Sequence, residues 1–439
     1  MMRNKQILAL DACDLVEHIH QQTLSATAVT HAYQQAIADR DPQTGAWHRL
    51  AGEDALRYAL AVDNRASKGA LAGIPFGVKD VIDTADIATG YGSAMYEGFQ
   101  PIADAGCVAL TRRAGGIVLG KTVSTELAMA SPNGTRNPHN LLHTPGGSSS
   151  GSCAAVAAGT ALAAYGTQTS GSVIRPASYC GVVGYKPSFG LITTSGIKAL
   201  SHSLDQVGII TRSVRDAALV ASAVALRPDF ALNRDDDRLA LRMGVFFSSD
   251  WTLAQPETLL AIEHTAQVMS HSGSVVIDVP VPPWFSDLFV MHDAVMGWEV
   301  TQALAYERSV MASRISPTTR DFLTLKAQAT SVEYLAAQAQ RLPRQLAMSA
   351  LFNGCDVLIT PAAAGEAPIG LDNTGDPFFN RAWTLLHLPC LTLPAVTGPN
   401  GLPVGVQLIG RPGGDRQLLR CAAAVEMQLR IAGSAVSRH

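Results

Sequence analysis

The sequence predicts an α/β protein whose sheet is largely covered by helices. Short apolar or β-branched segments bounded by glycine and proline alternate along the chain with amphipathic segments of helical periodicity. Segments that are apolar along their whole length are typical of strands buried on both faces of a sheet. Hydrophobic residues form 47% of the 439 residues and charged residues 16%, which is ample for a large core and argues against disorder.

The first part of the chain predicts helices and then buried strands. Residues 8–66 are expected to be helical, with Ser25 as the N-cap of a helix that runs through Ala36. Residues 73–82 (GIPFGVKDVI) predict a strand, because they are short, β-branched and bounded by Gly and Pro. Residues 106–122 predict a helix followed by a strand.

A polar run rich in Gly, Ser, Asn and Pro occupies residues 131–152. Such a run is usually a linker or a surface loop. Core-like sequence continues after it, so we do not expect a flexible linker here. Residues 154–164 then predict an alanine-rich helix whose small side chains allow close approach to the sheet.

The rest of the chain predicts helices over 257–271 and 332–351, where apolar residues recur with helical spacing. DVLIT (356–360) and LPVGVQLIG (402–410) predict buried strands. Residues 416–428 predict a closing helix. The sequence contains no internal repeat.

Charge and hydropathy exclude several classes of partner. The net charge is −3 and the pI about 6.5, so nothing attracts nucleic acid or an anionic membrane. The N-terminal 22 residues contain only a short apolar stretch and do not resemble a signal peptide. The most apolar long segment, 153–165, is shorter than the roughly 20 residues needed to span a bilayer.

The cysteines indicate a reduced, cytoplasmic protein. Seven scattered cysteines form no C-x-x-C pair, so we expect free thiols, several of them buried. No His/Cys cluster has ligand spacing and no H-E-x-x-H motif occurs, so the sequence predicts no metal site.

Lys79 is the first residue that suggests chemistry. It lies in the apolar segment 73–82, where burial would favour the neutral amine, which can accept a proton. Taken alone, a lysine at a strand end more often places its ammonium in solvent.

The second segment is PGGSSSGS (145–152). A P-loop is not expected, because Ser152 stands where that motif needs lysine. A nucleophile elbow centred on Ser149 would match G-x-S-x-G, but the polar, proline-broken residues 133–145 do not supply the strand that must precede it. An ordinary Gly/Ser loop remains the alternative.

The third segment is GTQTSGSVIRP (166–176). Small residues crowd 169–172, and their backbone N–H groups could converge as an oxyanion hole requires, with Ser172 at the same point. The alternative is an ordinary strand-to-helix turn. The three segments together offer a nucleophilic serine, a second serine and a lysine base, a known variant of the histidine triad.

These segments resemble the amidase signature family. The resemblance covers most of the chain and is weakest at 217–350. The matching motifs are GIPFGVKD (73–80), KTVSTELAM (121–129), TPGGSSSGSCAAVAAG (144–159), GTQTSGSVIRPASYCGVVGYKPS (166–188), LDQVGIITRSVRD (204–216), DVLITPAA (356–363) and LPCLTLPAV with GLPVGVQLIGRP (388–412).

The resemblance implies the amidase signature fold, a single large α/β domain over residues 1–439. A large mixed central sheet would be covered on both faces by helices. Within the domain we expect four parts. They are a helical N-terminal part (1–66), a catalytic core (67–216), a divergent substrate-facing part (217–380) and a C-terminal return to the core (381–439).

The resemblance also implies the catalytic roles. Lys79 would be the general base, Ser148 the bridging serine held by a cis peptide, and Ser172 the acyl-forming nucleophile. This decides against Ser149 as nucleophile. The implied oxyanion donors are the backbone N–H groups of Thr169, Ser170, Gly171 and Ser172.

Two positions depart from the family's common G-T-D-T-G-G-S. Gln168 replaces the acid and can keep its hydrogen bonds but not its charge, and Ser170 replaces the first glycine. Arg175 and Asp205 match charged positions of the pattern, and we expect them to form a structural ion pair. With a Ser-Ser-Lys set present, structural or pocket-lining roles are expected for His139, His143, His202 and His387.

The activity implied is hydrolysis of a carbonyl C–N bond through an acyl-enzyme, without metal or organic cofactor. The substrate would be a small amide-like molecule, with aryl amides, carbamates or urethanes, and ureas all open. The acyl pocket is expected from 124–131 and 284–385, whose aromatic side chains suggest an apolar acyl group. The substrate-binding candidates are Met129, Ala130, Ser131, Trp298, Phe378 and Trp383.

Two other functions stay open at this point. A glutamine amidotransferase subunit that acts with partner chains on charged tRNA would have a similar core. A non-catalytic scaffold is disfavoured, since Lys79, Ser148 and Ser172 are all present. A homodimer is what the family suggests for assembly.

Overall fold

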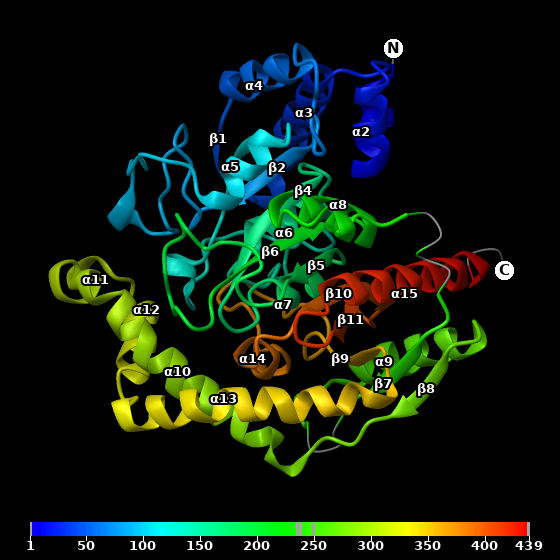
Figure 1. Cartoon of the computed structure of the whole chain (residues 1–439). Coiled ribbons are helices and arrows are strands. Elements are labelled where there is room, and N and C mark those ends of the chain that lie inside the picture. The colour runs from blue at the N-terminus through cyan, green and yellow to red at the C-terminus, as the bar shows by residue number, and fades with distance from the viewer. Residues whose placement is uncertain (1, 234–235, 237–238, 248–250, 437–439) are drawn as a thin grey trace.

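The computed structural model describes residues 2–233, 236, 239–247 and 251–436, and its core is one 11-stranded mixed sheet. The strand order is β1-β3-β2-β4-β6-β5-β10-β11-β9-β7-β8. This confirms the expected single α/β domain with a large mixed sheet flanked by helices (Figure 1). The strands are β1 (Trp47–Leu50), β2 (Pro75–Lys79), β3 (Ile117–Thr122), β4 (Ala163–Gln168), β5 (Val183–Lys186), β6 (Gln206–Thr211), β7 (Arg242–Val245), β8 (Val275–Asp278), β9 (Val357–Pro361), β10 (Cys390–Thr397) and β11 (Pro403–Ile409).

Parallel pairing places the ends of three strands together at the part of the sheet that carries the candidate site. β2 pairs in parallel with both β3 and β4, so Phe76 lies opposite Ala163 and Val78 opposite Tyr165. β4 continues antiparallel to β6. Because parallel strands end at the same edge, Lys79 at the end of β2 lies beside the final residues of β4.

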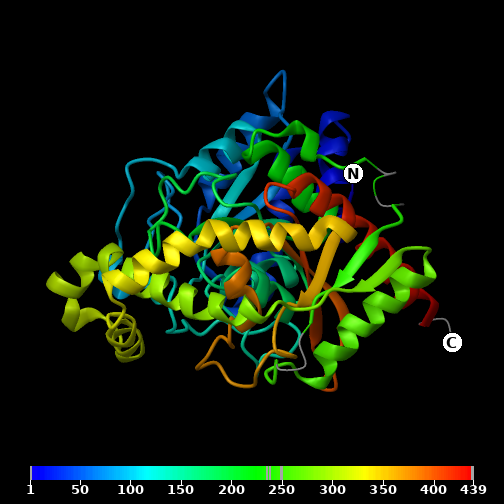
Figure 2. The ribbon, with the colours of Figure 1, turned by 60° about the horizontal axis from the view of Figure 1, so that its bottom comes forward.

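Fifteen α-helices lie in the described part of the chain. They are α1 (Asn4–Ala9), α2 (Ala12–His20), α3 (Ala26–Thr44), α4 (Glu53–Asp63), α5 (Gly106–Arg113), α6 (Ser150–Ala157), α7 (Ile174–Tyr179), α8 (Val214–Val224), α9 (Pro256–His271), α10 (Asp287–Ala303), α11 (Ala305–Val310), α12 (Pro317–Lys326), α13 (Ser331–Leu351), α14 (Phe378–Leu385) and α15 (Asp415–Val436). Helices α10–α13 form a layer outside the sheet, and its α11–α12 end projects from the rest of the molecule (Figures 1 and 2). Among the described helices, none combines the length and apolar character needed to cross a membrane.

Most elements agree with the sequence, including the Ser25 cap, whose side chain accepts from the Ala28 N–H at 3.1 Å. Two expectations were wrong. The N-terminal part is not wholly helical, because residues 47–50 form β1, an edge strand antiparallel to β3. The polar residues His48 and Arg49 interrupt the apolar pattern typical of a strand. Residues 47–50 are extended because they pair with β3.

The alanine-rich segment was also misassigned. Helix α6 starts earlier, at Ser150, and ends at Ala157, and the chain then turns at Gly159 with φ of 66° and enters β4 at Ala163. Alanine has high helix propensity, but here tertiary packing places Ala163 and Ala164 in a fully buried strand between β2 and β6. The polar run 131–152 is no linker, because its last ten residues are buried.

Candidate active site

A buried lysine bonded to a serine forms the centre of the site. Lys79 ends β2 with no exposed surface, and its Nζ lies 2.7 Å from Ser148 Oγ and 2.8 Å from Thr167 Oγ1. Ser148 follows a cis peptide bond after Gly147, as the resemblance implied. The first and second predicted segments therefore meet at one hydrogen bond, while Thr167 is a lysine partner that the sequence did not indicate.

The surroundings of Lys79 favour its neutral form. Burial lowers the pKa of Lys79 from its ordinary 10.5 to about 7, and the nearby Asp205 carboxylate opposes this shift only in part. At neutral pH a large fraction of this amine is thus unprotonated. A neutral amine at 2.7 Å from a hydroxyl can take that hydroxyl's proton.

Ser172 is half-buried, and its segment contacts the segment that holds Ser148. The backbone N–H of Ser149 donates to the Ser172 carbonyl at 3.3 Å, which joins the two serine segments. Among the described residues, none forms a hydrogen bond with Ser172 Oγ. Hydrogen bonds of catalytic hydroxyls are often long before substrate binds, so an unbonded Ser172 Oγ is compatible with the role of nucleophile.

The backbone N–H groups of Ser170, Gly171 and Ser172 donate to no described residue, so they are free to bind an anion. Gly171 fits only as glycine, because a Cβ there would lie 2.3 Å from Asn380 Oδ1. The oxyanion role of Thr169, Ser170, Gly171 and Ser172 stays a prediction, and these unpaired N–H groups are available for it.

The side chain of Gln168 bonds to the backbone that follows this turn. Its Oε1 accepts from the N–H groups of Val173 at 2.9 Å and Ile174 at 3.1 Å, and its Nε2 donates to Thr384 Oγ1 at 3.0 Å. The hydrogen-bonding role expected of Gln168 is confirmed. A glutamine in place of an acid keeps both backbone donors satisfied without burying a charge.

We expect Gln168→Leu to lower the free energy of unfolding by about 2–4 kcal/mol, because it leaves two buried N–H groups unpaired. Gln168→Glu is the matched control, since it keeps an acceptor for both groups and should cost less. Urea unfolding followed by circular dichroism measures both variants. Equal losses for Leu and Glu would contradict the hydrogen-bond explanation.

His292 is a neighbour of the turn that the sequence did not single out. It lies on α10, fully buried, with Nε2 3.0 Å from the Thr169 carbonyl oxygen and 3.3 Å from Ser170 Oγ. A carbonyl only accepts, so Nε2 carries the hydrogen and donates. Burial, with Arg381 nearby, lowers the pKa of His292 to about 4, so the ring is neutral at neutral pH.

The expected Arg175–Asp205 ion pair was wrong. Arg175 Nη2 donates to the Gly147 carbonyl at 2.7 Å and to Thr374 Oγ1 at 3.2 Å. Asp205 instead accepts from Thr169 Oγ1 at 2.6 Å and from the N–H groups of Leu200 and Ser201. Arg175 therefore bonds to the carbonyl of the residue before Ser148 through Nη2, while its buried Nε and Nη1 have no partner among the described residues. Asp205 bonds to the first residue of the oxyanion turn.

The four histidines considered for a triad form no hydrogen bond with Ser148 or Ser172 in the described structure. His139 bonds to the Cys180 carbonyl and His143 to the Ala367 carbonyl. His387 stacks on Phe189 and bonds to the Ser203 carbonyl, and His202 is exposed. Structural roles are thereby confirmed for His139, His143 and His387.

The two predicted pocket walls meet in the structure. Glu126, beside the 129–131 loop, accepts from the backbone N–H and the hydroxyl of Ser316, in the layer of α10–α13. Among the substrate-binding candidates, Met129 is buried, and Ala130 and Ser131 are half-buried. The segments 124–131 and 284–385 are therefore in contact, and their role as the walls of an acyl pocket stays a prediction.

The aromatic candidates occupy different places. Trp298 stacks on Tyr334 at 5.9 Å between α10 and α13, and Phe378 stacks on Phe289 at 4.3 Å. Trp383 is 1% exposed and packs against Phe246 and Phe285, so it is a residue of the hydrophobic core. Met296, from α10, contacts the turn, with its Sδ 3.5 Å from Ser170 Oγ.

Comparison with known proteins defines the class. The family model for Amidase matches residues 28–419. The chain is 32% identical, over 97% of both chains, to a glutamyl-tRNA(Gln) amidotransferase subunit from Anaeromyxobacter sp. (strain K). Peptide amidase from Stenotrophomonas maltophilia superposes with a TM-score of 0.80 at 29% identity, covering 96% of this chain and 97% of that one.

A further solved structure resembles the chain closely in fold. It is described as a vestigial protein complex that reveals the evolutionary origins of an s-triazine catabolic enzyme, with a TM-score of 0.86, 26% identity and coverage of 95% of this chain and 98% of that one. The fold and the family match together define an amidase-type C–N hydrolase fold. The chain belongs to the amidase signature family.

Proposed function

We propose that this protein hydrolyses a carbonyl C–N bond through an acyl-enzyme on Ser172, with Ser148 and Lys79 as its proton relay. The observation that carries the proposal is the 2.7 Å contact between the fully buried Lys79 amine and Ser148 Oγ. A backbone hydrogen bond of 3.3 Å from Ser149 to the Ser172 carbonyl joins Ser172 to the same region. Serine becomes a strong nucleophile only when a neighbouring group takes its proton, and this pair supplies that group.

The proposed reaction has two acyl-transfer steps. Neutral Lys79 takes a proton from Ser148, Ser148 takes one from Ser172, and Ser172 Oγ attacks the substrate carbonyl. The oxyanion is held by the free N–H groups of the 169–172 turn. The proton returns from Lys79 through Ser148 to the leaving nitrogen, and water then releases the acid by the reverse route.

The acyl group we propose is neutral and largely apolar. The described side chains that contact Ser170 Oγ are Met296 and the neutral ring of His292. The charged groups of Arg175 and Asp205 bond to the backbone and to threonine hydroxyls instead. Anilides, primary amides, ureas and carbamates assayed side by side would test this. Turnover restricted to charged acyl groups would contradict it.

A glutamine amidotransferase subunit is the second candidate. It is favoured by the 32% identity to the glutamyl-tRNA(Gln) amidotransferase subunit over nearly the whole chain. Glutaminase activity that appears only with partner subunits and charged tRNA would support it. Hydrolysis of small neutral amides by the isolated chain supports the first candidate.

We also propose a cytoplasmic location and a homodimer. All seven cysteines are free, six of them buried, which is the state expected in a reducing compartment. Sedimentation of the purified chain tests the dimer, and fractionation of cells tests the location.

His292→Leu is expected to lower kcat about tenfold with little change in KM. The Thr169 carbonyl and the Ser170 N–H belong to one peptide group, so loss of the hydrogen bond from His292 allows this N–H to change its orientation. Because the N–H is proposed to bind the oxyanion, the effect should fall mainly on kcat. His292→Gln can place a donor near the position of Nε2 and should restore most of kcat. A role in stability alone would show as a lowered Tm with unchanged kcat.

A further inference from the structure

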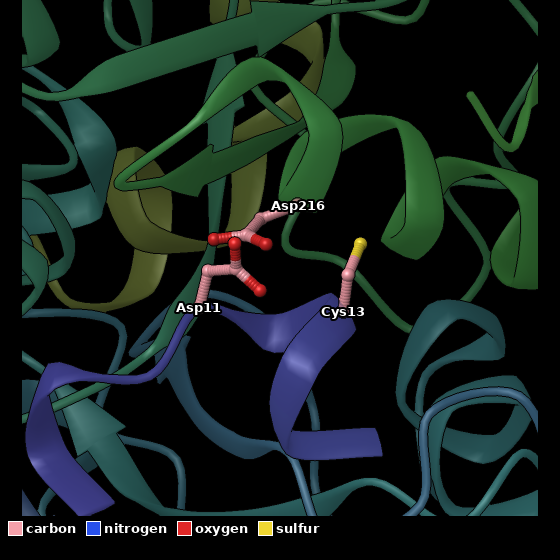
Figure 3. Close-up of side chains that lie close together, drawn as sticks. All are labelled: Asp11, Cys13 and Asp216. Atoms are coloured by element: carbon pink, nitrogen blue, oxygen red, sulfur yellow. The ribbon is translucent and has the colours of Figure 1, made fainter. Parts of the chain in front are cut away.

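Asp11, Cys13 and Asp216 bring two carboxylates and a thiol together, away from the candidate active site. One ligand atom from each, two oxygens and the sulfur, lie within 4.8 Å of one another. Figure 3 shows the two carboxylates facing each other, with the sulfur on the adjoining turn of α2. Asp11 and Cys13 lie at the start of α2 and Asp216 in the first turn of α8, about two hundred positions later.

Both carboxylates are oriented by backbone hydrogen bonds that use one oxygen each. Asp216 Oδ1 accepts from the Ala12 N–H at 2.9 Å, and Asp11 Oδ1 accepts from the Asp14 N–H at 2.7 Å. Both bonds satisfy N–H groups in the first turn of α2, one from its own N-cap and one from α8. They also fix the remaining oxygens in place, as the outer partners of metal ligands usually do.

The remaining oxygen of Asp216 has no partner. Asp216 has no exposed surface, and its Oδ2 forms no hydrogen bond with any described residue. A buried carboxylate oxygen without a donor costs free energy. The Asp216 carboxylate lies beside Asp11 and Cys13 (Figure 3), so a ligand bound among the three side chains would be in reach of this oxygen.

Cys13 differs from the other cysteines of the chain. It is the one thiol of the seven that is not buried, so an ion from solvent can reach it. Burial first, and then the charge of Asp216, raises the pKa of Cys13 to about 12. Burial and the charge of Asp11 raise the pKa of Asp216 to about 7, while Arg212 and Arg215 oppose these shifts only in part.

We propose that Asp11, Cys13 and Asp216 bind a divalent thiophilic cation, of which Zn²⁺ is the best match. Zinc takes thiolate and carboxylate ligands at about 2.3 Å and about 2.0–2.2 Å, and a fourth position can hold water. A divalent charge also removes the repulsion among three acidic groups. The sequence predicted no metal site, because Asp216 joins the pair only in the folded chain.

The proposed ion connects the start of α2 to α8. Asp11 is the N-cap of α2 and Cys13 lies in its first turn, whereas Asp216 belongs to α8, which follows the central strand β6. A ligand that binds only the folded state stabilises it. Zinc at this position should therefore stabilise the chain, and it should leave turnover at the Ser172 site unchanged because no member of the relay touches it.

Zinc binding to the metal-stripped chain tests the proposal. We expect one equivalent of Zn²⁺ by equilibrium dialysis and a higher Tm with Zn²⁺ present. We also expect a thiolate-to-metal charge-transfer band with Co²⁺. Cys13→Ser should remove the band and weaken zinc binding at least tenfold. Asp11→Asn keeps a capping side chain and should weaken binding similarly.

Asp14→Asn is the matched control, because it removes a neighbouring acid of the same helix that is outside the cluster. It should keep one equivalent of zinc and the charge-transfer band. The proposal is overturned if the wild-type chain binds much less than one equivalent, or if Cys13→Ser binds zinc as tightly as the wild type. Turnover and circular dichroism of each variant establish that it is folded.

Discussion

Ser172→Ala is expected to lower kcat on amide substrates by about 10⁴-fold or more, with little change in substrate binding. When the nucleophile of such a relay is removed, nearly all of the rate enhancement from covalent catalysis is lost. The contributions of the oxyanion hole and of substrate binding remain. Here the free N–H groups of the 169–172 turn would remain in the variant. Single-turnover kinetics on an anilide measures the loss.

Ser149→Ala is the matched control for this variant. Ser149 Oγ bonds only to the backbone of Thr167, accepting at 3.3 Å and donating at 3.4 Å, so its removal should cost some stability and little turnover. A fluorophosphonate should label Ser172 in the wild type and in Ser149→Ala. Labelling at Ser149, or full turnover by Ser172→Ala, would refute the assignment.

Lys79→Met is expected to lower kcat/KM about 10³-fold, the effect of losing a general base. In the wild type, kcat/KM should rise about tenfold per pH unit below pH 7 and level off above it, because the pKa of Lys79 is about 7 and only its neutral form accepts the proton. The pH profile of the wild type against an uncharged anilide measures this. A midpoint above pH 9 would contradict the lowered pKa of Lys79. Unchanged kcat/KM in Lys79→Met would show that Lys79 is not the base.

The same group links folding to pH. The folded-state pKa of Lys79, about 7, lies below its ordinary 10.5, so between these values the unfolded chain binds more protons. The free energy of unfolding therefore gains a contribution that rises with pH through this window. Lys79→Met should lack that contribution, which urea titrations of both proteins at pH 7 and pH 10 would show.

Local pattern was enough for much of the fold. Segments such as 73–82 and 402–410 are apolar, short and bounded by Gly or Pro, and they became β2 and β11. The pattern failed where pairing with other strands outweighed local preference. Residues 47–50 are polar enough to conceal an edge strand, and Ala163 and Ala164 favour a helix until β2 and β6 enclose them.

The candidate site divides in the same way. The sequence by itself determined which residues are available for chemistry, because Lys79, Ser148 and Ser172 stand in its three most unusual segments. Only the tertiary structure decided which of them meet. It gave Arg175 to the Gly147 carbonyl instead of Asp205, brought His292 to the oxyanion turn, and joined Asp216 to Cys13. Hydrogen bonds and burial depend on which residues are close in the folded chain. Contacts between residues far apart in the sequence therefore cannot be predicted from local spacing.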